Sequence, residues 1–150
     1  MSPFPESSPR PGGRAVLLSV KPRFADLIVA GKKQVEFRRV WAQEPVSWIA
    51  VYSSAPAQQI VAIVEVESVV LASASTLWAL SGCRGGGLTR TELRSYFAGK
   101  PKGYAVMLGR VLRPNAPLEP SEITQGFRAP QSFRYLTAPE VLRLCRKFEL

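Results

Sequence analysis

The alternation of hydrophobic and polar positions predicts a chain of strands with a few short helices between them. Patterns typical of strands, either a short apolar run or period-two alternation, occur in residues 15–20, 34–38, 47–52, 60–71, 104–112 and 129–136. Helical spacing of apolar residues, or a helix start signal, occurs in residues 22–30, 73–80, 89–98 and 137–148. This mixture predicts an α+β fold.

Capping residues mark several of the predicted helix ends. Pro22 suits a first helical position, and Gly31 suits the position just after a helix. Thr89 and Glu92 have the spacing of a capping box, and Thr137 is placed to cap the last helix. The apolar stripe of that last helix is predicted to comprise Val141, Leu142, Cys145 and Phe148.

The length of 150 residues, 46% of them hydrophobic, predicts one domain with a real core. Residues 1–14 are rich in Pro, Ser and Gly and are predicted to be a disordered leader, so the domain is expected to span residues 15–150. No apolar run approaches the roughly 18–20 residues that cross a bilayer, so no membrane partner is expected. Cys83 and Cys145 lack metal-ligand spacing, which favours reduced thiols in a cytoplasmic protein.

The chain contains no histidine. This excludes Ser-His-Asp triads, Cys-His pairs and ordinary zinc sites. With a single aspartate, Asp26, and two cysteines, we expect neither a metal nor a cofactor. Any catalysis would have to use Lys, Glu, Tyr, Ser, Thr or Arg.

The formal net charge is +9 and the pI is near 10.2, which favours an acidic partner, with RNA or single-stranded nucleic acid first. Basic side chains are concentrated in residues 31–39 and 84–113. A proteome that favours arginine throughout would give the same charge, and this alternative stays open.

The most informative stretch is residues 31–39. Glu36 and Arg38 lie two positions apart in a predicted strand and therefore project from the same face, with Lys33 at the strand entrance. An acid held between bases suits an anionic or hydrogen-bonding ligand such as a nucleotide. The alternative is a solvated strand face on which Glu36 and Arg38 only pair, worth roughly 0–1 kcal/mol.

Further ligand-binding candidates lie in turns between the predicted elements. Lys21 stands at a strand–helix junction, and Ser53 and Ser54 follow the predicted strand 47–52, where they either contact a ligand or cap an ordinary turn. Three basic residues farther along the chain are predicted to extend a phosphate-binding track: Lys100, Lys102 and Arg113.

Three features have mainly structural interpretations. The glycine-rich residues 82–87 lack the context of a phosphate loop and are predicted to be a flexible connection or a lid. Glu65 and Glu67 share one face of the predicted strand 60–71, where solvated edge positions are favoured over catalytic ones. Trp41, in a loop, is expected to be partly exposed.

Four motifs in this order resemble the ASCH domain of the PUA-like superfamily: Leu18-Ser19-Val20-Lys21-Pro22, Gly31-x-Lys33-x-x-Glu36-x-Arg38, Tyr52-Ser53-Ser54-x-Pro56 and Lys102-Gly103-Tyr104-Ala105. The resemblance covers roughly residues 16–113. Residues 130–135 also resemble the closing segment of bacterial single-domain members.

The resemblance implies a PUA-like mixed β-barrel with flanking helices, and a cleft whose floor carries Lys33, Glu36 and Arg38. Members of this family have been proposed to bind RNA, and some bacterial ones are enzymes. One branch is similar to an amidohydrolase of acetylated cytidine. Its lysine falls on Lys33, but its threonine position is Glu36 here and its glutamate falls within residues 85–87, so two of its three catalytic groups are missing. Other members resemble ribonucleases that act through Lys and Tyr or Glu.

Three hypotheses follow from these observations. The first is a binding module for RNA or nucleotides, including modified bases, in which Lys21, Lys33 and Arg38 bind phosphates or base acceptors and Glu36 accepts from amino groups. Ser53 and Ser54 would orient the ligand. The alternative is a metal-independent ribonuclease or a small amide hydrolase, with Lys33 and Glu36 as the catalytic candidates. The third is a protein-interaction domain that docks a partner through the C-terminal extension and helix.

Overall fold

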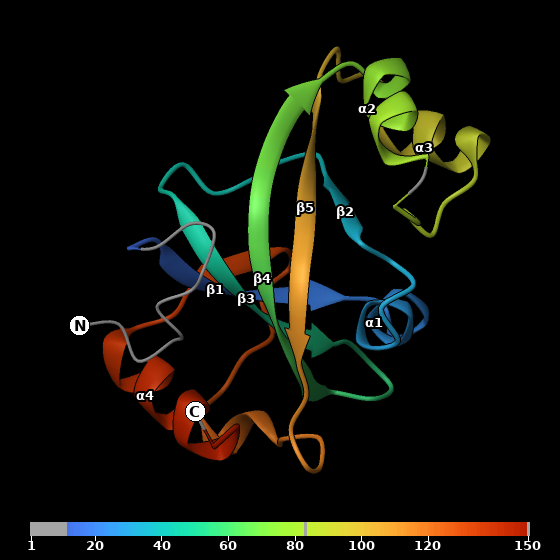
Figure 1. Cartoon of the computed structure of the whole chain (residues 1–150). Coiled ribbons are helices and arrows are strands. Elements are labelled where there is room, and N and C mark those ends of the chain that lie inside the picture. The colour runs from blue at the N-terminus through green and yellow to red at the C-terminus, as the bar shows by residue number, and fades with distance from the viewer. Residues whose placement is uncertain (1–11, 83, 150) are drawn as a thin grey trace.

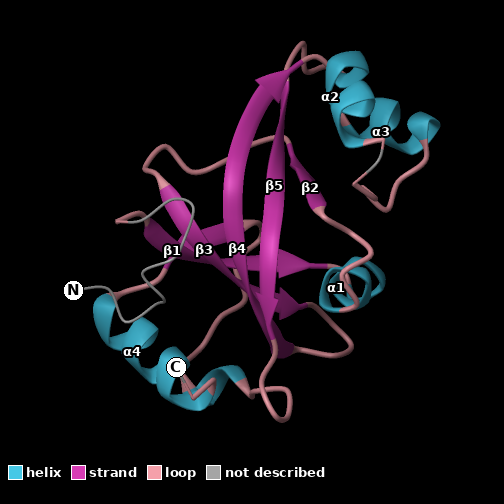
Figure 2. Cartoon of the chain, viewed as in Figure 1, coloured by secondary structure: helices cyan, strands magenta, loops and turns pink. Residues whose placement is uncertain are grey.

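The computed structural model describes residues 12–82 and 84–149. Most of the predicted leader, residues 1–11, lies outside the described residues, and the first strand begins at Arg14. Strands, helices and one 3-10 turn follow one another in this order: β1 (Arg14–Val20), α1 (Pro22–Val29), β2 (Val35–Arg38), β3 (Val46–Ser53), β4 (Gln59–Ala72), α2 (Ala74–Ser81), α3 (Arg90–Tyr96), β5 (Gly103–Leu112), η1 (Pro120–Glu122), β6 (Phe133–Tyr135) and α4 (Ala138–Lys147) (Figure 2). The α+β prediction is confirmed.

The strands form one mixed sheet in the order β2-β5-β4-β3-β1-β6. β1 and β3 run parallel because α1 and β2 carry the chain back between them, and the other neighbours are antiparallel. The sheet is strongly curled into a half-barrel, with α2 and α3 at one end of the long β4–β5 ribbon and α4 toward the other end (Figure 1). The predicted mixed barrel with flanking helices is therefore confirmed in outline.

Alternation along β1 explains how the sheet is covered on both faces. Val16 and Leu18 point into a cluster that includes Ala25 and Ile28 of α1. Leu17 points to the opposite face, into a cluster with α4. A third cluster joins α2 and α3 to the β2 and β5 end of the sheet. Because successive side chains of a strand point to opposite faces, this one short strand anchors two of the three clusters.

One residue of the apolar stripe predicted for the last helix, Leu142, does not lie on its buried face. Leu144 is buried in α4 beside Cys145, whereas Leu142 is 48% exposed. From Val141, the i, i+3, i+4, i+7 spacing of a helical stripe reaches Leu144, Cys145 and Phe148, so Leu144 belongs to the stripe and Leu142 does not. Trp41 is also buried, against a prediction of partial exposure, because its ring packs 5.4 Å from that of Phe133.

β4 contains two register irregularities, on either side of Val66. Glu65 is buried there: its Oε1 accepts from the Arg110 backbone N–H at 3.0 Å, and its Oε2 from the Arg110 guanidinium at 3.3 Å. The strand therefore does not present Glu65 and Glu67 as two equivalent solvated groups. A bulge leaves backbone groups without ladder partners, and here a carboxylate supplies one.

Candidate functional site

A cleft of about 860 Å³ opens beside the end of β1 and is bounded by α1, β2, α3 and residues 129–131. Five of the candidates named from sequence line it: Lys21, Lys33, Glu36, Arg38 and Ser54. They come from three separate stretches of the chain. The turn between β1 and α1 supplies Lys21, the entrance and face of β2 supply the central three, and the end of β3 leads to Ser54.

Lys33 is a buried cation at the base of the cleft, with only 3% of its surface exposed. Its Nζ lies 3.3 Å from Glu36 Oε1 and donates to the carbonyl oxygen of Gly86. The same nitrogen lies 5.2 Å from the ring centre of Phe24 and 5.6 Å from that of Phe37, within range of cation–π attraction. Burial lowers the pKa of Lys33 below its ordinary value; the Glu36 carboxylate opposes this shift and the Arg38 charge adds to it.

Glu36 stands between two cations. Its Oε2 lies 3.4 Å from Arg38 Nη1, and Arg38 Nη2 donates to Ser132 Oγ at 2.7 Å. Glu36 and Arg38 share one face of β2, as the two-residue spacing predicted. The carboxylate is 6% exposed, so it is largely removed from water yet still lines the cleft.

The glycine-rich loop is packed against the entrance of β2, which differs from the prediction of a flexible connection or a lid. The Gln34 backbone N–H donates to the carbonyls of Arg84 at 2.9 Å and Gly85 at 3.1 Å. A side chain at Gly86 would meet the Phe37 ring, because an ideal Cβ there lies 2.5 Å from a ring carbon. The glycine lets the loop backbone approach closely enough for its carbonyl to bind Lys33.

The far wall of the cleft comes from the C-terminal part of the chain. Ser19 Oγ donates to the Pro130 carbonyl at 2.6 Å, and the Ser19 backbone N–H donates to the Ser132 carbonyl at 2.9 Å. Ser132 therefore contacts both β1 and Arg38. Sequence reasoning placed Ser132 in an alternating segment and gave it no role in the site, because nothing local marks a serine whose partner is 94 positions away.

The open side of the cleft carries an ion pair between α1 and α3. Arg23 Nη2 lies 3.1 Å from Glu92 Oε2, both side chains are largely exposed, and both line the cleft. Glu92 also closes the predicted capping box with Thr89. Hydrogen bonding to the Thr89 backbone, and then the Arg23 guanidinium, lowers the pKa of Glu92. The sequence marked Glu92 as a cap and gave no sign that Arg23 would face it.

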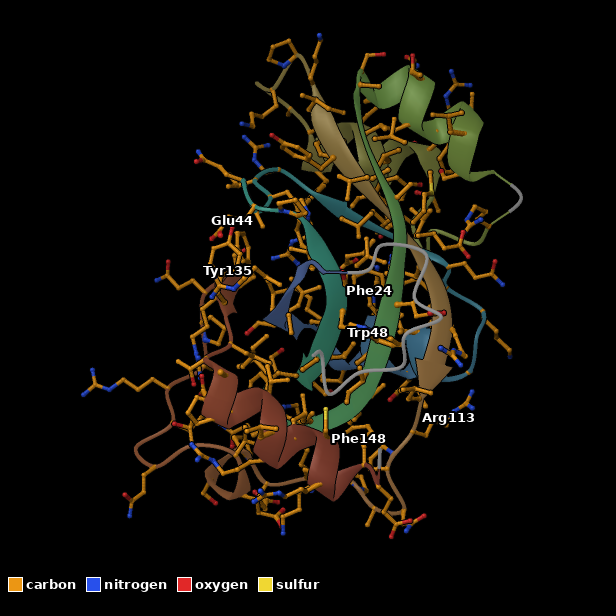
Figure 3. The ribbon with its side chains drawn as sticks, turned by 60° about the vertical axis from the view of Figure 1, so that its left-hand side comes forward. Phe24, Glu44, Trp48, Arg113, Tyr135 and Phe148 are labelled. Carbon is orange, nitrogen blue, oxygen red and sulfur yellow. The ribbon has the colours of Figure 1, made fainter. Side chains whose placement is uncertain are left out.

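Two parts of the predicted site lie elsewhere. Ser53 is 2% exposed within β3 and does not line the cleft. Lys100 and Lys102 precede β5 whereas Arg113 follows it, and a ten-residue strand separates them by roughly 30 Å. Arg113 Nε donates to the Val29 carbonyl at 2.8 Å and so satisfies the end of α1 (Figure 3). Arg113 therefore lies at the opposite end of β5 from Lys100 and Lys102.

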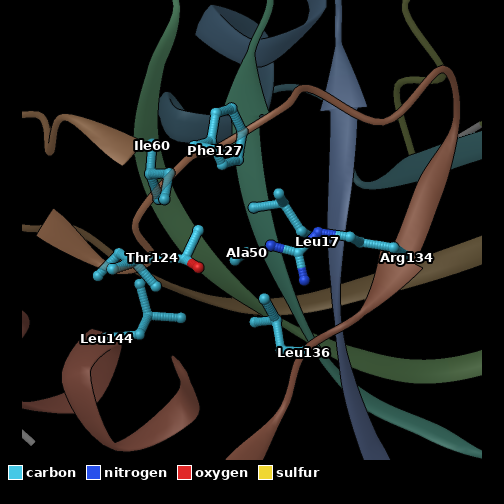
Figure 4. A pocket seen from close by; sticks show the side chains of 9 residues that line it. Leu17, Ala50, Ile60, Thr124, Phe127, Arg134, Leu136 and Leu144 are labelled. Carbon is cyan, nitrogen blue, oxygen red and sulfur yellow. The ribbon is translucent and has the colours of Figure 1, made fainter. Parts of the chain in front are cut away.

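Smaller cavities lie elsewhere among the described residues. An apolar cavity of about 10 Å³ between the sheet and α4 has room for about one water molecule (Figure 4). Among residues 12–82 and 84–149, no group of three or more His, Cys, Asp or Glu side chains could hold a metal ion. Within the same ranges, no helix is long and apolar enough to cross a membrane.

The curled mixed sheet, with a charged cleft at the end of β1, defines a small PUA-like domain. Residues 18–107 match the family described as the ASCH domain, and the chain belongs to the ASCH domain family. The resemblance inferred from the sequence motifs is confirmed.

Relatives of known name or structure support this assignment. A protein of Zymomonas mobilis named ASCH domain-containing ribonuclease is 33% identical over 143 residues, covering 89% of this chain and 92% of the relative. The crystal structure of ASCH from Zymomonas mobilis matches with a TM-score of 0.80 at 32% identity, over 89% of this chain and 94% of that one. A tyrosine-to-phenylalanine variant of that protein matches with the same TM-score at 31% identity, over 89% and 97% of the two chains. The predicted RNA-binding module agrees with this family and with the name of the first relative.

Proposed function

We propose that this protein binds single-stranded RNA in the cleft formed by β1, α1, β2, α3 and residues 129–131. The observation that carries the proposal is the largely buried row of Lys33, Glu36 and Arg38 at the base of a cleft whose rim carries the exposed cations Lys21 and Arg23. Family membership and the name of the Zymomonas mobilis relative support it.

The layout of the cleft suits a nucleotide that enters base first. Exposed cations at the rim are placed for phosphates, which supply most of the affinity of nucleic-acid complexes. Phe24 lines the interior and is partly exposed, so its ring offers an apolar surface against which a base can stack. A deep, partly desolvated row of hydrogen-bonding groups can read a base edge only when the base is unpaired, which favours single strands over duplex RNA.

The test is equilibrium binding of a fluorescently labelled single-stranded RNA, measured by anisotropy at several salt concentrations. Three to four phosphate contacts predict that affinity falls by about 20- to 50-fold between 50 and 200 mM salt. Binding that does not change over this range, or no binding at 50 mM, would rule out the proposal.

Matched lysine variants locate the binding surface. Lys21 lines the cleft, whereas Lys32, which is also exposed and only one residue from the buried lysine, does not. We expect Lys21→Gln to weaken binding several-fold and to reduce the salt dependence by about one phosphate contact. Lys32→Gln and Arg113→Gln should bind as the unmodified protein does. Equal losses in all three variants would indicate a diffuse charge effect and no defined cleft.

A second candidate function is metal-independent RNA cleavage, favoured by the name of the relative that covers most of this chain. In that reaction Glu36 would take the proton of the ribose 2′-hydroxyl, whose oxygen attacks the adjacent phosphorus to form a 2′,3′-cyclic phosphate. The 5′-oxygen would leave with a proton from water, and Lys33 would stabilise the charge on the phosphate. Labelled RNA incubated with the protein, Lys33→Ala and Glu36→Gln decides this. Cleavage that both variants retain would come from a contaminant.

Hydrolysis of an acyl group on a modified nucleoside is the least supported alternative. The threonine of the amidohydrolase branch is replaced by Glu36, and the position of its glutamate lies in the loop that touches Phe37 through Gly86. Incubation with acylated nucleosides beside the RNA assay tests it directly.

We also propose a cytoplasmic location, since Cys145 is a buried free thiol.

A further inference from the structure

We propose that the cleft selects uracil, by pairing with the imide edge of the base, a ring N–H flanked by two carbonyl oxygens. This proposal rests on the RNA binding proposed above and names the base that the same site prefers. It assigns the acceptor role to Glu36 and the two donor roles to Lys33 and Arg38.

Glu36 keeps acceptor capacity that its protein partners do not use. Lys33 contacts Oε1 at 3.3 Å and Arg38 contacts Oε2 at 3.4 Å, one partner on each oxygen. An ionised carboxylate offers about four lone-pair sites, so both oxygens can accept again. A carboxylate that is 6% exposed and faces a cleft is poorly hydrated. A ligand N–H would replace a hydrogen bond to water that the carboxylate loses on burial.

Donors remain on both sides of this carboxylate. Lys33 has three N–H donors, and its described contacts, Glu36 and the Gly86 carbonyl, account for two of them. Arg38 has five, and its described contacts, Glu36 and Ser132, account for two. Both residues line the cleft, so the row presented to a ligand is donor, acceptor, donor.

Uracil alone among the four RNA bases matches this row at every position. Its edge presents a carbonyl, the N3–H and a second carbonyl, so each cation meets an oxygen and the carboxylate meets the N–H. Cytosine and adenine present an amino group beside a bare ring nitrogen. They either set that nitrogen against the carboxylate or leave one cation without an acceptor. Guanine pairs its carbonyl and N–H but brings its amino group against the second cation.

Packing around the row supports recognition of a single flat base. The partly exposed Phe24 ring lies 5.2 Å from the Lys33 ammonium and lines the same cleft, and the buried Phe37 ring lies 5.6 Å from the ammonium. The link from Arg38 to Ser132 joins β2 to the C-terminal wall, and this fixes one donor of the row. Held groups discriminate better than mobile ones because a wrong base cannot rearrange them.

The decisive measurement compares labelled octamers of U, C and A, cytosine octamers with one central U or G, and a U octamer methylated at every N3. We expect the U octamer to bind about 10- to 100-fold more tightly than the C and A octamers, and one central U to bind more tightly than one central G. Methylation removes the N3–H and should erase the preference. Thymine shares this edge, so a dT octamer should likewise bind more tightly than a dC octamer.

Equal binding of the U and C octamers, or indifference to N3 methylation, would overturn the uracil assignment while leaving RNA binding intact. Failure of every oligonucleotide to bind would overturn RNA binding as well, so the two outcomes are distinct. In Glu36→Gln the ratio of U to C affinity should fall toward one, whereas Lys32→Gln should keep the ratio of the unmodified protein. If Glu36→Gln does not fold, the methylated octamer still decides the question with the unmodified protein.

Discussion

Replacement of Glu36 by glutamine tests the electrostatic arrangement at the base of the cleft. The substitution keeps the size of the side chain and removes the charge between Lys33 and Arg38. Lys33 would then remain 3% exposed with no carboxylate beside it. Its described contacts would be the Gly86 carbonyl and two aromatic rings.

The size of the effect follows from the burial of the pair. Removing one partner of a buried ion pair typically costs about 3–5 kcal/mol, because an uncompensated charge stays behind. The cleft admits some water to Glu36, so we expect about 3 kcal/mol of lost unfolding free energy, the lower end of that range. Lys33→Met keeps the apolar stem and removes the stranded charge. The double variant should therefore recover about 2 kcal/mol relative to the sum of the two single changes.

The loss of stability in Glu36→Gln depends on pH through the protonation of Lys33. Burial and Arg38 lower the pKa of Lys33, and Glu36 opposes them, so the pKa falls further in Glu36→Gln. Above that lowered pKa the folded variant has lost the proton, whereas the unfolded chain keeps it until about pH 10.5. The unfolded state then binds more protons, so unfolding free energy rises with pH. The deficit of the variant should therefore be largest near pH 7 and shrink toward pH 9.5.

Urea unfolding followed by tryptophan fluorescence at pH 7 and 9.5 measures these quantities. The control is Glu44→Gln, which breaks the exposed pair with Arg14 and should cost less than about 1 kcal/mol. A cost below about 0.5 kcal/mol for Glu36→Gln, unchanged between the two pH values, would refute the claim that Glu36 stabilises a buried cation.

Three further predictions concern the scaffold. Two charge-assisted bonds from an arginine lower the pKa of Glu140 to about 2. The carboxylate therefore contributes about 2 kcal/mol of unfolding free energy above about pH 4.5, and this contribution is lost as the pH falls toward 2. In urea titrations at pH 7 and 3, Glu140→Gln should show a smaller loss of stability at the lower pH than the unmodified protein. Gly85→Ala should lower the unfolding free energy by about 2–3 kcal/mol, since the φ of Gly85 is +66° and an added Cβ would lie 2.0 Å from a backbone oxygen. Gly31→Ala, at φ +75° in open space, should lower it by about 1 kcal/mol. Similar losses in the two variants would contradict the close packing of the glycine-rich loop. Leu144→Ala should lower the unfolding free energy by about 3 kcal/mol, and Leu142→Ala by less than about 0.5 kcal/mol. Thermal unfolding measures both losses, and a larger loss in Leu142→Ala would contradict the assignment of Leu144 to the core.

Local regularities explain which parts of the fold and site the sequence could predict. The two-residue spacing of Glu36 and Arg38 sets them on one face of β2 whatever surrounds the strand. The capping box at Thr89 and the cap at Thr137 likewise mark where α3 and α4 begin, and both are present. Each of these features depends on residues close together in the chain.

Features that depend on distant partners could not be predicted. The bond from Arg38 to Ser132 exists because β6 pairs with β1, and nothing near Ser132 announces that pairing. Charge alone suggests a phosphate track for Arg113, whereas its bond to the end of α1 joins residues 84 positions apart in the chain. By contrast, the wrong residue in the predicted α4 stripe has a local explanation, because the three-residue spacing from Val141 leads to Leu144, which is buried, and not to Leu142.

The short strand β6 bears on how the domain can be shortened. Residues 18–107 match the family, yet β6 at 133–135 covers the free edge of β1, and residues 129–131 close one side of the cleft. A protein trimmed to the matched segment would leave β1 with an uncovered row of backbone donors and acceptors, which invites self-association. Recombinant versions intended for ligand studies should therefore extend at least through Tyr135.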